Sequence, residues 1–114
     1  MEIYGFNEDE SLRIMLAVKR REEQPPYSYD DECDIAKAKI EAAFWRIRQD
    51  ERIYTETVTL FVDGNPCLCS KIVVLAYAGF GVPEIGDILF PDIKIADDVI
   101  RYTLIRFTKE IWEN

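Results

Sequence analysis

Residues 31–49, DECDIAKAKIEAAFWRIRQ, decide the fold, and their pattern predicts an α-helix. Asp30 precedes the stretch with a side chain of the type that caps helix N-termini, and acidic residues fill the expected first turn. Arg46 and Arg48 lie near the end, where positive charge offsets the negative end of the helix dipole. Four alanines inside the stretch add helix propensity.

This predicted helix is apolar on two faces. One set of apolar residues follows helical spacing along one side: Cys33, Ala36, Ile40, Ala43, Phe44 and Ile47. A second set does so on nearly the opposite side: Ile35, Ala38, Ala42 and Trp45. A helix of this kind must be covered twice, either by two layers of its own domain or by one layer and a second chain.

Two further helices are predicted near the ends of the chain. The first follows Asn7, which forms a capping-box pattern with Glu10, and it ends at the basic residues 19–21. Its core face is expected to be Leu12, Met15 and Leu16, with Ile14 and Val18 beside it. Alternation along 12–18 also fits a strand, but the charges at both ends of the segment favour a helix.

The last helix runs from residue 96 or 97 to about 112. Its core stripe is Ile100, Leu104, Phe107 and Ile111, with Tyr102, Ile105 and Trp112 off that stripe.

The middle of the chain has a different composition and predicts strands. Residues 53–62 are rich in β-branched and aromatic side chains, and a DGNP turn separates them from the apolar run 67–78. We interpret the two runs as a β-hairpin, since a lone strand would have no pairing partner nearby. The alternative is that Pro66 opens a buried helix ending at Gly79 or Gly81.

Short strands are also expected at 87–90, before Pro91, and at the N-terminus through Ile3 and Tyr4, with the glycine-rich segment 79–86 as a loop. The predicted fold is α+β, with three main helices packed on a small antiparallel sheet in the order α-α-β-β-(β)-α. At 114 residues, positions 1–114 form a single domain.

The net charge of −8 restricts the partners of the chain. Negative charge repels phosphate, so direct nucleic-acid binding and adhesion to an anionic membrane are not expected, and a basic protein is the favoured partner. Solubility alone would also explain an acidic surface. The acidic N-terminus lacks the apolar core of a signal peptide, which together with three cysteines predicts a cytoplasmic protein; the longest apolar run, 72–80, is half a membrane span.

The absence of histidine removes most familiar catalytic chemistry. Ser-His-acid and Cys-His mechanisms need this side chain as their base. The glycines of AGFGVPEIG miss the spacing that binds dinucleotides. Cys33, Cys67 and Cys69 lack an evident fourth ligand for zinc, so we expect no metal and no cofactor.

The first functional hypothesis is a non-enzymatic protein-interaction module of the inhibitor, immunity, adaptor or phage-accessory type. It would bind a basic protein, or its own copy as a homodimer, through apolar helix faces. The expected apolar anchors are Ile35, Trp45, Tyr102 and Trp112, unless a three-layer domain buries them in its core. The acids expected to steer a basic partner are Glu8, Asp9, Glu10, Asp30, Asp31 and Asp34.

The second hypothesis is a small carboxylate-based enzyme or a metal- or ligand-binding protein. It requires Glu84, Asp87 and either Asp97 or Asp98 to converge on one pocket. Each of these acids also stands where a turn or a helix start would place it for structural reasons.

Overall fold

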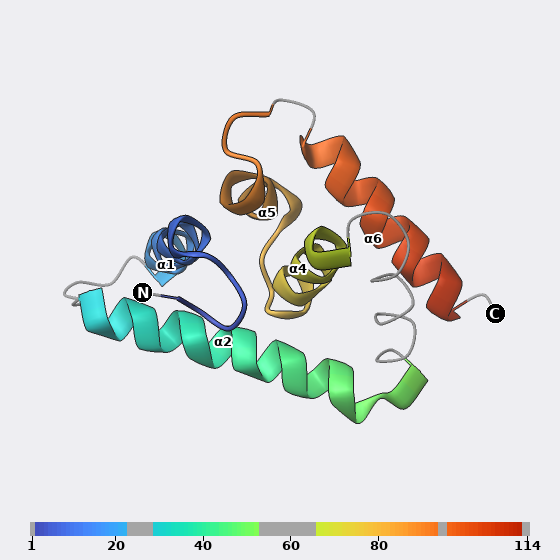
Figure 1. Ribbon diagram of the computed structural model, residues 1–114, viewed down its shortest axis with the longest axis horizontal. Helices are drawn as coiled ribbons and strands as arrows, with labels where there is room; N and C mark the ends of the chain where they lie inside the picture. The colour runs from blue at the N-terminus through green and yellow to red at the C-terminus, as the bar shows by residue number, and fades with distance from the viewer. Residues whose placement is uncertain (1, 23–28, 53–65, 94–95, 113–114) are drawn as a thin grey trace.

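The computed structural model describes residues 2–22, 29–52, 66–93 and 96–112, which fold as helices around one shared core (Figure 1). The helices are α1 (Glu8–Glu22), α2 (Tyr29–Gln49), α4 (Pro66–Tyr77), α5 (Val82–Leu89) and α6 (Ala96–Trp112). Apart from an isolated bridge between Ile3 and Phe6, the described residues contain no β structure. The prediction of an α+β fold is therefore wrong for this part of the chain, and the predicted strand at 53–62 lies outside the described residues.

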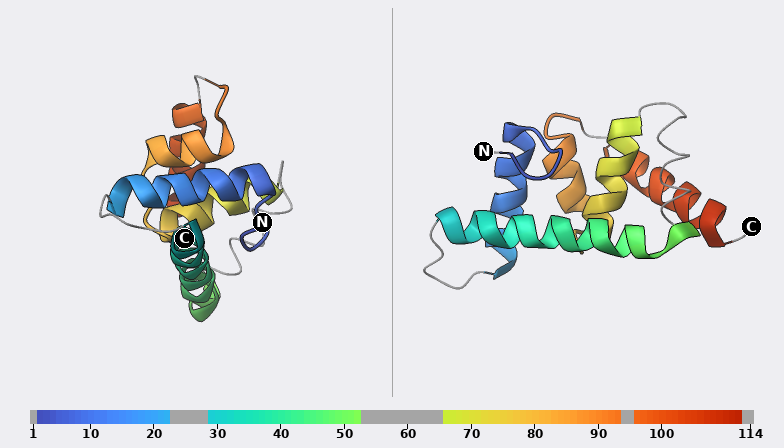
Figure 2. Two further views of the ribbon diagram at one scale, coloured as in Figure 1. Left: turned by 90° about the vertical axis from the view of Figure 1, so that its left-hand side faces the viewer. Right: turned by 60° about the horizontal axis from the view of Figure 1, so that its bottom comes forward.

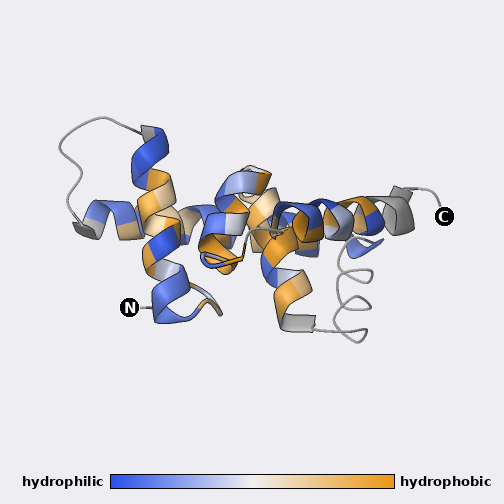
Figure 3. Ribbon diagram, turned by 90° about the horizontal axis from the view of Figure 1, so that it is seen from above, coloured by the Kyte–Doolittle hydropathy of each residue, from blue (hydrophilic) through white to orange (hydrophobic). Residues whose placement is uncertain are grey.

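α4 stands where the second hairpin strand was predicted. The consecutive residues Ile72, Val73, Val74 and Leu75 are each exposed by 1% or less, so the helix is buried on every side. α2, α5 and α6 all contact it, and its apolar character is visible in Figure 3. A continuous apolar run fits a central strand and a central helix equally well, which is why the prediction of a strand failed. The alternative, a buried helix opened by Pro66, is confirmed.

The end of α4 is a Schellman motif, which turns the chain toward α5. Gly79 has a φ of +93°, a left-handed conformation that glycine adopts without steric cost. Its N–H donates to the carbonyl of Ala76 (3.0 Å), and the N–H of Phe80 donates to the carbonyl of Leu75 (3.1 Å). Two carbonyls that the helix would otherwise leave unpaired are thereby satisfied.

α5 replaces both the predicted loop at 79–86 and the predicted strand at 87–90. The helix follows Gly81 and has Pro83 in its first turn, a position where proline loses no helical hydrogen bond. The carboxylate of Glu84 accepts the N–H of Gly81 at 2.9 Å, as one half of a capping box does. These residues mark a helix start, which the loop interpretation of the glycines overlooked.

The N-terminal segment is a tight turn rather than an edge strand. Tyr4 and Gly5 both have positive φ values (35° and 84°), and the N–H of Phe6 donates to the carbonyl of Ile3 at 2.8 Å. Ile3 and Phe6 are buried, and the N–H of Ile3 donates to the Ser11 hydroxyl at 2.8 Å. The turn thus covers the start of α1 and belongs to the core.

The predicted capping box at the start of α1 is confirmed. The N–H of Glu10 donates to Asn7 Oδ1 (2.8 Å), and the N–H of Asn7 donates to Glu10 Oε1 (3.0 Å). The same Glu10 oxygen lies 2.7 Å from Lys71 Nζ on α4. The box therefore also fastens α1 to the central helix.

The core faces of α2 and α6 agree with the prediction, whereas that of α1 agrees only in part. In α2, Phe44 is half-buried and the rest of the predicted stripe is buried: Cys33, Ala36, Ile40, Ala43 and Ile47. In α6, Ile100 and Phe107 are buried and Leu104 is half-buried, while the side chain of Ile111 lies outside the description. In α1, the buried apolar residues are Ile14, Met15, Ala17 and Val18. The prediction is therefore right for Met15 and for Ile14 and Val18 beside it, whereas Leu12 is half-buried and Leu16, at 50% exposed, is not a core residue.

The C-terminal ends of α2 and α4 lie together. Arg46 donates to the carbonyl of Tyr77 at 2.9 Å, which places positive charge at the negative end of α4. Burial, and to a smaller extent the nearby Asp50 carboxylate, raises the pKa of the Tyr77 phenol above its ordinary value. The neutral phenol is thus the form that this junction stabilises.

Leu75→Ala should lower the free energy of unfolding by about 2–5 kcal/mol, because a cavity remains in a packed core. The same substitution at the half-exposed Leu16 should lower it by less than about 1 kcal/mol. Urea denaturation followed by circular dichroism measures both values. Equal losses at the two positions would contradict the central place of α4.

Above about pH 10 the free energy of unfolding should fall, because the unfolded phenol of Tyr77 loses its proton before the folded one. This contribution is fully present below about pH 10 and disappears as the pH rises through the folded pKa. Tyr77→Phe removes the group, so the loss of stability on alkaline titration should be smaller than in wild type. Urea denaturation at about pH 9 and 11 measures the loss of unfolding free energy between the two pH values. Tyr102→Phe, at an exposed tyrosine, is the control. An identical loss in Tyr77→Phe and wild type would show that Tyr77 does not cause it.

Candidate functional site

The outer face of α6 carries exposed apolar side chains. Val99, Tyr102 and Ile105 follow one another at three-residue spacing and are 40%, 68% and 65% exposed. Side chains at this spacing neighbour one another on one side of a helix. The other side of α6 holds Ile100 and Phe107 in the core, so the helix has two apolar faces, one of them open to solvent.

The second apolar stripe of α2 is exposed at one end. Trp45 is 57% exposed, whereas Ile35 is half-buried and packs against the core. Burial in the core, the alternative to an interface role, therefore applies in part to Ile35 but not to Trp45. α2 and α6 do not pack against each other in the described part of the chain, so Trp45 and Tyr102 lie on two helices that are joined only through others. Trp112 is the last residue of α6, and its side chain lies outside the description.

The acidic residues predicted to steer a basic partner do not gather on one patch. Glu8 and Asp9 are in the first turn of α1, which crosses α2 (Figure 2). Glu32 in α2 lies 3.8 Å from Lys19 near the end of α1, which places the start of α2 beside the opposite end of α1. The exposed Asp31 and Asp34 are thus separated from the first pair by roughly 15 Å of helix.

Two more of the acids predicted to steer a basic partner, Glu10 and Asp30, are not among the exposed acidic side chains that the structure describes. Glu10 is buried, and its carboxylate accepts the Asn7 N–H and binds Lys71. Asp30 lies inside α2, which begins at Tyr29, so it does not occupy the cap position; its side chain is not among those described.

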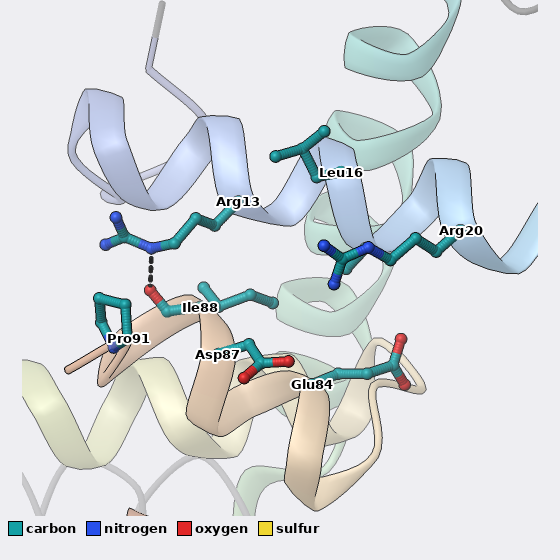
Figure 4. Close-up of a pocket in the computed structure, with 8 residues that line it drawn as sticks. Arg13, Leu16, Arg20, Glu84, Asp87, Ile88 and Pro91 are labelled. Carbon is teal, nitrogen blue, oxygen red and sulfur yellow. Dashed lines mark hydrogen bonds between the residues drawn. The ribbon is translucent and has the colours of Figure 1, made fainter. Parts of the chain in front are cut away.

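An open groove of about 290 Å³ lies along the junction of α1 and α5 (Figure 4). Its lining residues are Arg13, Leu16, Ala17, Arg20, Glu84, Asp87, Ile88 and Pro91. Of the predicted carboxylate cluster, Glu84 and Asp87 line it, whereas Asp97 lies where α5 and α6 meet, near Gly86. The predicted acids therefore do not converge on one pocket.

Two of the charged residues that line this groove, Arg13 and Glu84, hold α1 and α5 together. Arg21 Nε donates to Glu84 Oε2 at 2.9 Å, and its Nη2 contacts Glu84 Oε1. Arg13 Nε donates to the Ile88 carbonyl at 2.6 Å (Figure 4). Within the ranges described, no three His, Cys, Asp or Glu side chains gather as a metal would need. The groove thus gives the carboxylate-chemistry hypothesis little support.

Comparison with known proteins assigns no family, since no family model, curated protein or solved structure matches the chain. None of the helices in the described ranges is both long enough and apolar enough to cross a membrane. The function of the chain must therefore be inferred from its own exposed side chains.

Trp45→Ala should change the free energy of unfolding by less than about 1 kcal/mol, because more than half of the side chain already faces solvent. Phe80→Ala, at a buried aromatic, should cost about 3–5 kcal/mol and serves as the contrast. Urea denaturation measures the change in the free energy of unfolding for both variants. If Trp45→Ala unfolds the domain, Trp45 is a core residue and is lost as a candidate anchor.

Proposed function

We propose that the chain is a non-enzymatic protein-interaction module that binds through the outer face of α6. One observation carries the proposal: Val99, Tyr102 and Ile105 are exposed together on a helix whose other face is anchored in the core. Exposed aromatic and aliphatic side chains grouped on one surface are typical of protein interfaces.

The packing of the inner side of α6 also favours a binding role for its outer face. α6 packs on both α4 and α5, and Ile100 on its inner side is completely buried. A helix held in this way presents its outer side chains without a large loss of conformational freedom on binding. Tyrosine is also among the residues that most often dominate interface energetics. The face thus suits recognition by a partner helix or groove.

The charge of the chain acts on this binding from a distance. With a net charge of −8, association with a basic protein would be accelerated at low salt. The outer face of α6 itself carries both signs, since Asp98, Arg101 and Arg106 are all exposed on it. A basic partner is therefore predicted from the net charge, which acts while the two proteins approach each other, and not from the charges on the outer face of α6. Trp45 on α2 remains a predicted anchor of a second surface.

The double variant Tyr102→Ser/Ile105→Ser should lose the associations of this face and keep the fold. Both side chains are exposed, so the free energy of unfolding should change by less than about 1 kcal/mol. The measurement is quantitative capture of tagged full-length chain and its variants from the cells that produce it, together with solution mass for self-association. Leu16→Ser, also at an exposed apolar position, is the matched control and should behave like wild type. A double variant that keeps every association of wild type would overturn the proposal.

A further inference from the structure

We infer that the groove along the junction of α1 and α5 binds a small zwitterion, an α-amino acid with an aliphatic side chain. The carboxylate of this ligand faces Arg20 on α1, and its ammonium group faces Asp87 on α5. Its side chain lies on the apolar middle of the groove. The inference goes beyond the proposed function, because it concerns a different surface and a small molecule instead of a protein.

The two walls of the groove carry charges of opposite sign. The charged residues on the α1 wall, Arg13 and Arg20, are both basic, and those on the α5 wall, Glu84 and Asp87, are both acidic. One residue of each pair is engaged in the fold, since Arg13 donates to the Ile88 carbonyl at 2.6 Å and Glu84 accepts from Arg21 at 2.9 Å. These contacts fix the two walls relative to each other, so a ligand meets a surface that is already formed.

Arg20 and Asp87 are the charges that the fold does not use. Both are exposed, and in the described ranges neither side chain forms a hydrogen bond or an ion pair. In Figure 4 the Arg20 side chain extends over the groove from α1, while Asp87 projects from α5. Asp87 repels an anion that Arg20 attracts, and Arg20 repels a cation that Asp87 attracts. A molecule with both charges is therefore favoured over one with either charge alone.

The zwitterion also suits the charge of the whole chain. A molecule without net charge is not repelled at a distance by the −8 of the protein, whereas a simple anion is. The field of the chain thus opposes small carboxylates in general. It leaves the two groove charges to decide which ligand binds.

The middle of the groove is apolar and can hold an aliphatic side chain. Ala17 and Ile88, exposed by 8% and 0%, line it from the two helices, and the half-exposed Leu16 lies beside them. Arg13 and Arg20 are seven residues apart, which corresponds to about 10 Å along α1. A side chain the size of leucine fits within this length and would cover apolar surface that now faces water.

The size and openness of the groove predict a small ligand and a low affinity. Its volume of about 290 Å³ is at the lower end of the range found for small-molecule sites. An open groove leaves part of the ligand in water, so the dissociation constant should be on the order of 1 mM.

The deciding experiment compares L-leucine with two molecules that each lack one of its charges. 4-Methylpentanoate has the same side chain and carboxylate but no amino group, and 3-methylbutylamine has the side chain and ammonium group but no carboxylate. Amide chemical shifts of the isotope-labelled chain, followed at physiological salt up to about 10 mM probe, give the three dissociation constants. L-Leucine should bind about tenfold more tightly than either analogue and should shift amides of α1 and α5.

Two substitutions should each remove one half of this preference. In Asp87→Asn the groove no longer attracts the ammonium group, so L-leucine and 4-methylpentanoate should bind equally. In Arg20→Gln it no longer attracts the carboxylate, so L-leucine and 3-methylbutylamine should bind equally. Both positions are exposed, so the variants should stay folded, and their amide spectra show this directly.

Matched variants control for net charge. Glu41 and Arg48 are exposed on α2, so Glu41→Gln and Arg48→Gln change the total charge by the same amounts as Asp87→Asn and Arg20→Gln without touching the groove. Both controls should keep the preference of wild type for L-leucine. Tyr102→Ser/Ile105→Ser should also bind L-leucine as wild type does, which keeps this test separate from that of the proposed function.

Three results would overturn the inference. The first is no shift with L-leucine up to about 10 mM. The second is a set of shifts that lies away from α1 and α5. The third is equal binding of the three probes to wild type, or a preference that Asp87→Asn and Arg20→Gln leave as unchanged as the controls do.

Discussion

The four consecutive buried residues 72–75 of α4 are the constraint on which the rest of the structure depends. A helix that is apolar all round must be covered on every side, and at this chain length a ring of short helices is what can cover it. α2, α5 and α6 supply that cover. Each covering helix has a second side that faces outward, and on α2 and α6 that side carries apolar residues. The exposed surfaces from which we infer protein binding are thus the outer sides of the helices that enclose α4.

Polar side chains then determine how the covering helices are oriented, and they do so at helix ends. Arg46 binds the last carbonyl of α4, and Arg13 binds a carbonyl in the last turn of α5. Lys71 reaches the carboxylate that caps α1. The two arginines place positive charge on carbonyls at helix C-termini, and each of the three contacts joins two different helices. Apolar packing therefore provides most of the stability, while these contacts provide the relative orientation of the helices.

Helices with charged ends and periodic apolar residues could be predicted from the sequence, and α1, α2 and α6 meet both conditions. α4 could not be separated from a strand because residues 72–75 have no period, and α5 was overlooked because Gly81 and Pro83 were interpreted as loop residues. For the candidate site, the apolar spacing left interface and core positions open for Trp45, Tyr102 and Ile35; the first two are exposed, whereas Ile35 is half-buried. Glu10 shows the limit of such reasoning: an acid in a first turn suits a solvated surface and a capping box alike, and its contact with Lys71 joins positions 61 residues apart.

Separations of this kind recur wherever α1 meets the second half of the chain. Arg21 and Glu84 are 63 residues apart, and Arg13 and Ile88 are 75 apart. The ring of Phe80 lies beneath the cations of both Arg21 and Lys39, which come from two different helices. Large chain loops must close before these contacts can form, and loop closure costs entropy in advance of any contact energy. Although its described secondary structure is helical, this chain should therefore reach its native state more slowly than helical bundles whose contacts are local in sequence.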